Sequence, residues 1–224
     1  MAELYRTVGL EPDRYGGAFR GLYVDIVPPA LDGDRPLGPS VRLRPQLEQA
    51  DPPAWLDELP RPLVYATLGT VFNTPASFRP LLDALGEAEV GALVTVGRDV
   101  DPAELGDVPP NVRVERFVPQ AQVLPAASVV ISHGGSGTLL GTLAAGVPLV
   151  LVPQGANQFE NAARCERIGV AASVAPGEPI APALAAVLAE PRYAEAARRV
   201  RAEIEAMPTP DEVAQAVEEH AGRG

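Results

Sequence analysis

From residue 63 onward, short apolar runs alternate with segments in which apolar residues recur at a helical period. The apolar runs contain many β-branched residues and end at glycine, serine or proline, which is typical of buried strands. The pattern predicts strands at 63–69, 92–97, 112–118, 128–132, 148–153 and 170–174. It predicts helices at 76–88, 122–126, 136–146, 157–169, 180–190, 191–206 and 210–220.

The predicted strands are apolar on both faces, and most of them are followed by a helix. This is the pattern of βαβ units, in which a parallel sheet is covered by helices on both sides. We therefore expect an α/β fold with a Rossmann-like parallel sheet and helices on both faces. Ligands of such sheets bind beyond the carboxyl ends of the strands, where three polar turns lie: Gly69-Thr70, Gly97-Arg98 and 132–137.

The first 62 residues do not show this regular alternation of apolar runs and helical segments. A short polar helix and a glycine-rich turn are expected within 1–21, followed by a strand that ends at Pro28 and Pro29. The residues after these prolines carry many more prolines and little periodicity, which indicates a linker that lies on a surface. We accordingly expect an N-terminal linker arm over 1–62 and the main folded domain over 63–224.

Composition and charge restrict the partners. Aromatic residues are only 5% of the chain, so the core is built mainly from Ala, Val and Leu. The net charge of −11 argues against nucleic acid, because binding to a phosphate backbone needs a basic surface. No apolar run approaches the ~20 residues of a membrane span, and no signal-peptide pattern is present. We expect a cytoplasmic protein without a membrane partner, in which the single cysteine, Cys165, is a buried apolar residue rather than a nucleophile.

The strongest candidate site is the segment 128–148, in which a buried strand runs into a glycine-rich turn and then a helix. Glycine lets the backbone approach a ligand closely. The first turn of a helix leaves N–H groups unpaired at the positive end of the helix dipole, which suits a phosphate. His133 adds a donor there, and Ser136 and Thr138 add hydroxyl groups. The alternative is a strand-to-helix turn that merely requires glycine.

Two common phosphate-binding motifs do not fit this segment. A Walker loop ends in Gly-Lys-Ser/Thr, and the chain contains no lysine. A dinucleotide-binding turn reads Gly-x-Gly-x-x-Gly and has an acidic residue about 20 residues later, whereas the next strand here ends in Pro153-Gln154-Gly155. Because no Asp/Glu pair has the spacing of metal ligands either, we expect neither a metal nor another cofactor.

Four short blocks occur in order around this segment: Phe-Val-Pro-Gln at 117–120, His-Gly-Gly-Ser-Gly-Thr at 133–138, Gly-Val-Pro at 146–148 and Pro-Gln-Gly-Ala-Asn-Gln-x-x-Asn-Ala at 153–162. Together they resemble the donor-binding signature of the UDP-glycosyltransferase-like superfamily, whose members have the two-domain GT-B fold. The chain is similar to its actinomycete, calicheamicin-type members, which attach deoxysugars to natural products. The resemblance implies one half of a GT-B fold, namely the C-terminal domain that binds a nucleoside diphosphate sugar.

By position, the resemblance assigns roles to residues in these blocks. Phe117 and Val118 would flank the nucleobase, and Gln120 would bond near the base or ribose. His133 would donate to a phosphate, and the pyrophosphate would be held by Gly135, Ser136, Gly137 and Thr138. Asn157 and Gln158 would bond sugar hydroxyls, and Thr70 would lie near the phosphates or the acceptor cleft.

Several of these residues have a plainer alternative. Phe117 would equally suit core packing, and Gln120 and Gln158 would suit the capping of loops. For Arg98 the sequence leaves two roles open, a phosphate contact and a solvated loop charge.

Two positions depart from the plant members of the superfamily. Those members have a carboxylate eight residues after the motif histidine, which holds the ribose hydroxyls, and this chain has Gly141 there. The loss of that contact favours a deoxyribose donor, dTDP rather than UDP. They also have an acid before the glutamine of the sugar loop, where this chain has Asn157, so the identity of the sugar stays open.

The resemblance implies that residues 1–62 are only a remnant of the acceptor domain together with the interdomain linker, so most of the acceptor side of the reaction has no counterpart in this sequence. In the superfamily, an N-terminal domain binds the acceptor and carries the base that deprotonates it. The two histidines here do not fit that role, because His133 belongs to the phosphates and His220 lies near the C-terminus. The resemblance implies an inverting, metal-independent transfer to a hydroxyl of a small natural product by the complete enzyme. For this chain it implies donor binding, with no catalytic residue, beside an acceptor-binding domain or subunit.

Other hypotheses remain beside this one. The chain could be a naturally split donor-binding subunit that needs a separate acceptor-binding protein. It could be a different enzyme on the same architecture, such as a nucleotide-sugar epimerase, which would need catalytic acids that the motifs do not provide. A non-catalytic module is the last alternative, and a pure scaffold would bind no nucleotide.

Overall fold

A computed structural model describes residues 2–7, 9, 21–31, 38–46, 50–69 and 74–222. The chain divides into two compact units, one made of Met1–Arg44 with Ala206–Gly224 and the other of Pro45–Glu205. These units are divided at other residues than the border expected from the sequence, after residue 62, and that functional border stays a prediction.

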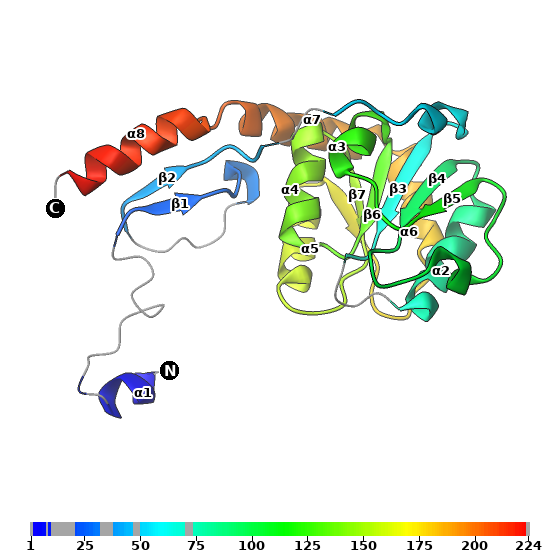
Figure 1. Cartoon of the computed structure of the whole chain (residues 1–224), viewed down its shortest axis with the longest axis horizontal. Coiled ribbons are helices and arrows are strands. Elements are labelled where there is room, and N and C mark those ends of the chain that lie inside the picture. The colour runs from blue at the N-terminus through cyan, green and yellow to red at the C-terminus, as the bar shows by residue number, and fades with distance from the viewer. Residues whose placement is uncertain are drawn as a thin grey trace. The chain divides into compact units, whose positions relative to one another are not determined.

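The larger unit is built on a six-stranded sheet with the strand order β5-β4-β3-β6-β7-β8 (Figure 1). All neighbouring strands run parallel. The strands are β3 (Leu63–Thr67), β4 (Gly91–Thr95), β5 (Val112–Glu115), β6 (Val129–Ser132), β7 (Leu149–Leu151) and β8 (Ala171–Ser173). The chain adds strands outward from β3 to β5 and then returns to the other side of β3 with β6. The strands β3 and β6 therefore flank the switch point at which open α/β sheets bind ligands.

Helices cover both faces of this sheet. The side chains of β3 alternate, with Val64 and Ala66 in one buried cluster and Leu63 and Tyr65 in another. The helices are α2 (Pro75–Glu87), α3 (Gln120–Val123), α4 (Ser136–Ala145), α5 (Gln158–Arg167), α6 (Ala181–Ala189) and α7 (Pro191–Glu205). Short 3-10 helices are η3 (Ala54–Glu58), η4 (Pro102–Leu105) and η5 (Leu124–Ala126). The predicted α/β fold with a Rossmann-like parallel sheet is confirmed.

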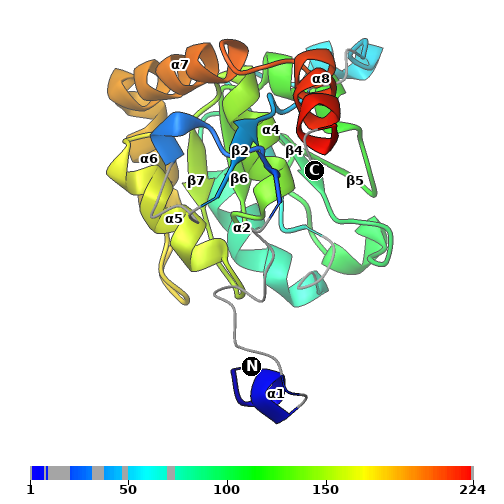
Figure 2. The ribbon, with the colours of Figure 1, turned by 90° about the vertical axis from the view of Figure 1, so that its left-hand side faces the viewer.

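Helix α4 directs its N-terminus toward the carboxyl ends of the strands. It begins after Gly135 and ends at Gly146. A Cβ atom added to Gly146 would lie 3.0 Å from Cδ of Arg201 in α7, so α7 packs against the C-terminal end of α4. Two views show α7 lying across one end of the larger unit (Figures 1 and 2). The N-terminal turn of α4 is left to face the opposite end, where the glycine-rich block lies.

The smaller unit contains a two-stranded parallel sheet, β1 (Tyr23–Asp25) and β2 (Ser40–Arg42), with helix α8 (Pro210–Ala221), helix α1 (Ala2–Thr7) and the 3-10 helix η2 (Pro29–Leu31). The backbone N–H of Arg44 donates to the carbonyl of Pro208 at 2.9 Å, which ties the end of β2 to the start of α8. The sequence pattern does not predict β2, because three residues are too few to show alternation. Within the described part of the chain, no helix is long and apolar enough to cross a membrane.

Candidate functional site

A cavity of about 590 Å³ opens at the carboxyl ends of β3, β4 and β6, beside the switch point of the sheet. Its wall includes nine of the donor-site residues expected from the sequence: Phe117, Val118, Gln120, His133, Gly135, Ser136, Gly137, Thr138 and Gln158. Asn157 does not line the cavity, and Thr70 lies outside the described residues. Three of the four sequence blocks therefore meet in one place, although their roles toward a ligand stay predictions.

His133 follows β6 directly, and its imidazole is held between two glycines. A Cβ atom at Gly69 would lie 2.6 Å from Cε1 of His133, and one at Gly135 would collide with Nε2. The absence of these two Cβ atoms makes the space that the ring occupies. Burial lowers the pKa of His133 from its usual 6.5, so the ring is neutral at pH 7. Its Nδ1 is buried and has no hydrogen-bond partner among the described residues.

The first turn of α4 lies beside this imidazole and presents unpaired backbone N–H groups to the cavity. It contains no acidic side chain that would compete with an anion. The turn is held from α5, because Nδ2 of Asn161 donates to the carbonyl of Gly134 at 2.8 Å. Asn157 also contributes here, since its Nδ2 donates to Oγ of Ser136 at 3.4 Å. The arrangement is a rigid, electropositive end of the cavity.

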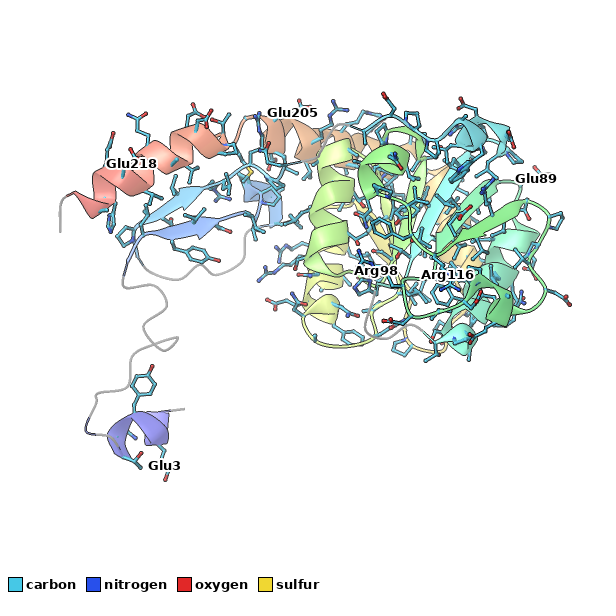
Figure 3. All side chains as sticks on the ribbon, in the orientation of Figure 1. Glu3, Glu89, Arg98, Arg116, Glu205 and Glu218 are labelled. Atoms are coloured by element: carbon cyan, nitrogen blue, oxygen red, sulfur yellow. The ribbon has the colours of Figure 1, made fainter. Side chains whose placement is uncertain are left out.

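The opposite end of the cavity is aromatic. Phe117 follows β5 and the residue is 62% exposed, so core packing does not describe it. Val118 is buried and belongs to the second hydrophobic cluster. The guanidinium carbon of Arg98 lies 5.9 Å from the centroid of the Phe117 ring, and the two roles that the sequence left open for Arg98 stay open. Arg98 and Arg116 lie at the same end of the sheet (Figure 3).

A buried polar network forms the floor between these two ends. The side-chain amide of Gln120 donates to Oγ1 of Thr138 at 2.9 Å, so Gln120 joins two blocks rather than capping its own loop. The hydroxyls of Tyr65 and Thr95 share a hydrogen bond of 3.1 Å. Burial raises the pKa of Tyr65 above 10.0, and hydrogen bonds to Thr95, Gln120 and Thr67 oppose that shift.

Gln158 has the loop-capping role that the sequence left as an alternative. Its Oε1 accepts from the backbone N–H groups of Gln154 at 2.7 Å and Gly155 at 3.1 Å. Its Nε2 has no protein partner in the part of the chain that the structure describes. The side chain therefore fixes the loop after β7 and still lines the cavity with an amide donor.

Sequence motifs do not indicate every residue of this cavity. The further lining residues are Tyr65, Thr67, Leu68, Thr95, Arg116 and Ala156. A polar residue close to the carboxyl end of a buried strand is the signal that could have pointed to Tyr65 and Thr95. Among the described residues, no group of three or more His, Cys, Asp and Glu side chains is placed to hold a metal ion.

Comparisons with known proteins agree with this geometry. Residues 79–220 match the protein family described as erythromycin biosynthesis protein CIII-like, C-terminal domain. The elloramycin glycosyltransferase ElmGT of Streptomyces olivaceus is 41% identical over 160 residues, which cover 69% of this chain and 41% of that protein. The 4'-demethylrebeccamycin synthase of Lentzea aerocolonigenes is 35% identical over an alignment of 230 residues, and this alignment covers 91% of this chain and 53% of that protein. The chain thus spans about half the length of these relatives.

Solved glycosyltransferases share the fold. The calicheamicin glycosyltransferase CalG4 matches with a TM-score of 0.81 and 27% identity, covering 99% of this chain and 60% of that chain. The spinosyn rhamnosyltransferase SpnG complexed with thymidine diphosphate matches with a TM-score of 0.78 and 26% identity, covering 97% of this chain and 61% of that chain. The resemblance to one half of a GT-B fold and to actinomycete natural-product glycosyltransferases, expected from the sequence, is confirmed.

Proposed function

This chain belongs to the erythromycin biosynthesis protein CIII-like C-terminal domain family of glycosyltransferases, and we propose that it binds the nucleoside diphosphate sugar of such an enzyme. One observation carries the proposal: His133 and the N-terminal turn of α4 face the same cavity. The cavity volume of about 590 Å³ lies within the range of small-molecule sites.

The diphosphate would lie at the electropositive end of the cavity. Unpaired N–H groups and the helix dipole attract its negative charge. In a neutral imidazole one ring nitrogen carries a proton and the other does not. His133 can therefore donate a single N–H hydrogen bond to a phosphate oxygen. These groups are in place before the ligand arrives, so they need little reorganisation when charge develops on the leaving group.

The two ends of the ligand would extend from this point in opposite directions. The nucleobase would contact the exposed ring of Phe117, with Val118 and Gln120 beneath it. The sugar would lie toward the loop after β7, where Gln158 offers its amide nitrogen. Asn157 would support the phosphate-binding turn, because its amide contacts Ser136. Since Asn157 does not line the cavity, it would bond a sugar hydroxyl only if the sugar extended beyond the cavity wall.

The chemistry of the complete enzyme would be an inverting transfer. A base takes the proton of the acceptor hydroxyl, the oxygen attacks the anomeric carbon, and the bond from that carbon to the diphosphate oxygen breaks. We assign the base to an acceptor-binding domain or subunit. His133 faces the diphosphate end of the cavity, and His220 is an exposed residue of α8 in the other compact unit.

The donor would carry dTDP rather than UDP. Gly141 has no side chain with which to hold a ribose 2′-hydroxyl, so a deoxyribose loses no contact at that position. The solved relative SpnG, which has thymidine diphosphate bound, supports the same preference.

Calorimetric titration of the 224-residue chain with dTDP and with UDP tests the proposal. We expect dTDP to bind more tightly, and we expect His133→Ala to weaken dTDP at least tenfold, which is about 1.4 kcal/mol. His220→Ala is the matched control, because it removes the other histidine from an exposed position on α8. Circular dichroism establishes that both variants fold. Binding of neither nucleotide by the unaltered chain, or an equal loss in both variants, would overturn the proposal.

A second measurement tests whether this chain binds the donor without carrying the catalytic base. Incubation of the chain with a dTDP-sugar and a phenolic acceptor should give donor binding without glycoside formation. Glycoside formation by the chain alone would show that the catalytic base lies within these residues.

A further inference from the structure

We infer that Arg98 is a donor-recognition residue whose guanidinium forms the second face of a slot for the nucleobase, opposite the ring of Phe117. The inference rests on the proposed binding of a nucleoside diphosphate. It assigns Arg98 a role in base stacking, which differs from both roles that the sequence left open.

The distance between the two groups is the first observation. The guanidinium carbon of Arg98 lies 5.9 Å from the Phe117 centroid. Two other arginines in the larger unit lie much closer to a ring, Arg113 over Trp55 at 3.9 Å and Arg192 over Tyr193 at 4.5 Å. A flat base needs about 3.5 Å to each neighbouring plane, or about 7 Å in all. The distance from the Arg98 guanidinium carbon to the Phe117 centroid is about 1 Å short of that separation, and an outward shift of this size by an exposed side chain admits the base.

The backbone that carries the two side chains is held in register. The N–H of Gly97 donates to the carbonyl of Arg116 at 2.9 Å, and the N–H of Val96 donates to the carbonyl of Glu115 at 3.1 Å. These bonds extend the pairing of β4 with β5 beyond the strand ends, up to the residues next to Arg98 and Phe117. Only the side chains have to move when a base enters the slot.

The charges at this end of the cavity leave Arg98 available. Arg116 lines the cavity, but its guanidinium is paired with Asp101 at 2.6 Å. The other oxygen of Asp101 accepts from the N–H of Ala103 at 3.1 Å, which fixes the carboxylate on η4. Arg98 is exposed, lies next to Gly97 at the rim of the cavity rather than in its wall, and forms no ion pair with the residues that the structure describes. A planar guanidinium of this kind stacks on aromatic faces and on bases.

The position of Arg98 in the sheet favours the base over the phosphates. Arg98 follows β4, and His133 follows β6, with β3 between these strands. Neighbouring strands lie about 4.8 Å apart, so the two backbone positions are separated by about 10 Å across the sheet. The guanidinium is turned toward Phe117, which follows the next strand on the side away from His133.

Titration of the full chain with two ligands separates stacking from phosphate binding. The ligands are dTDP and inorganic pyrophosphate, and the variants are Arg98→Ala, Arg98→Lys and the control Arg199→Ala on the exposed face of α7. We expect Arg98→Ala to weaken dTDP roughly fivefold and to leave pyrophosphate unchanged. Arg98→Lys should restore little of the loss, because an ammonium group keeps the charge but has no plane to stack. Arg199→Ala should bind both ligands as the unaltered chain does.

Each other result has a definite meaning. If Arg98→Ala weakened pyrophosphate as much as dTDP and lysine restored both, Arg98 would bind phosphate and the stacking role would be wrong. If the unaltered chain bound dTDP and Arg98→Ala bound it equally well, only the inference on Arg98 would fail. If the unaltered chain bound neither ligand, the proposed function itself would fail and this inference with it.

Discussion

The side-chain amide of Gln120 donates a 2.9 Å hydrogen bond to the hydroxyl of Thr138, and this bond joins the first residue of α3 to the first turn of α4. The aromatic end and the phosphate end of the cavity are thereby held at a fixed separation. A ligand that spans both ends binds a site that is already assembled, which lowers the entropy cost of binding.

A double-mutant cycle on this pair measures that effect. We expect Gln120→Leu and Thr138→Val each to weaken dTDP binding, with a coupling energy of about 0.5–1.5 kcal/mol between them, because either change alone breaks the same bond. Calorimetric dissociation constants of the two single variants and the double variant give the coupling. Thr138→Ser keeps the hydroxyl and should retain most of the affinity. Strictly additive losses would mean that the two residues act on the ligand separately.

The space around the His133 imidazole gives a second prediction. A Cβ atom at Gly135 would collide with Nε2 of the ring, whereas one at Gly137 would meet no atom within 4 Å. We expect Gly135→Ala to displace the ring and to weaken dTDP roughly tenfold or more. Gly137→Ala should instead raise the free energy of unfolding by about 0.5–1 kcal/mol, because it stiffens a helical residue.

Two measurements separate these outcomes. The NMR signal of the Cε1 proton of His133 should shift in Gly135→Ala and stay in place in Gly137→Ala, and urea titration gives the unfolding free energies. An unchanged His133 signal and unchanged affinity in Gly135→Ala would show that the ring can move aside at no cost.

The segment from β6 to α4 shows why much of this fold can be predicted from sequence. A buried strand, a glycine turn and a helix follow one another within 129–145, so local patterning is enough to place His133 at a strand end next to a helix N-terminus. The same patterning overextends β5, which is predicted to reach residue 118 and ends at Glu115. Phe117 and Val118 look like a continuation of the strand, but only Val118 is buried.

Contacts between distant segments could not be predicted in this way. Tyr65 and Thr95 lie on neighbouring strands, and their hydrogen bond depends on the register of β3 with β4, which no local pattern encodes. Arg98 and Phe117 meet for the same reason beyond the ends of β4 and β5. Gln158 illustrates a different limit, because the side chain whose oxygen caps a loop also lines the cavity, so the two alternatives that the sequence offered do not exclude each other.

The lowered pKa of His133 makes the stability of the protein depend on pH. Burial holds the folded-state pKa below 6.5, so the unfolded chain binds more protons at any pH between the two values. The free energy of unfolding therefore falls as the pH is lowered through 6.5 toward the folded-state pKa, and this contribution levels off below it.

Urea unfolding at pH 7.5 and pH 5.5 checks this dependence. The decrease in unfolding free energy between the two conditions should be smaller in His133→Asn than in the unaltered chain, because the variant lacks the titrating group. His220→Asn, at an exposed position, should keep the full decrease. Identical decreases in the unaltered chain and in His133→Asn would show that the pKa of His133 does not differ between folded and unfolded states.

The last prediction concerns metal removal. In the proposed site, the N-terminus of α4 and the N–H of His133 stabilise the diphosphate, and neither group requires a cation. We expect the dissociation constant for dTDP to change by less than about twofold, or about 0.4 kcal/mol, between buffer with EDTA and buffer with Mg²⁺. His133→Ala, measured in both buffers, shows whether a cation can replace the imidazole. A tenfold or greater gain in affinity with Mg²⁺ in the unaltered chain would mean that the diphosphate is bound as its metal complex. The N-terminus of α4 would then contribute less to binding of the diphosphate than proposed here.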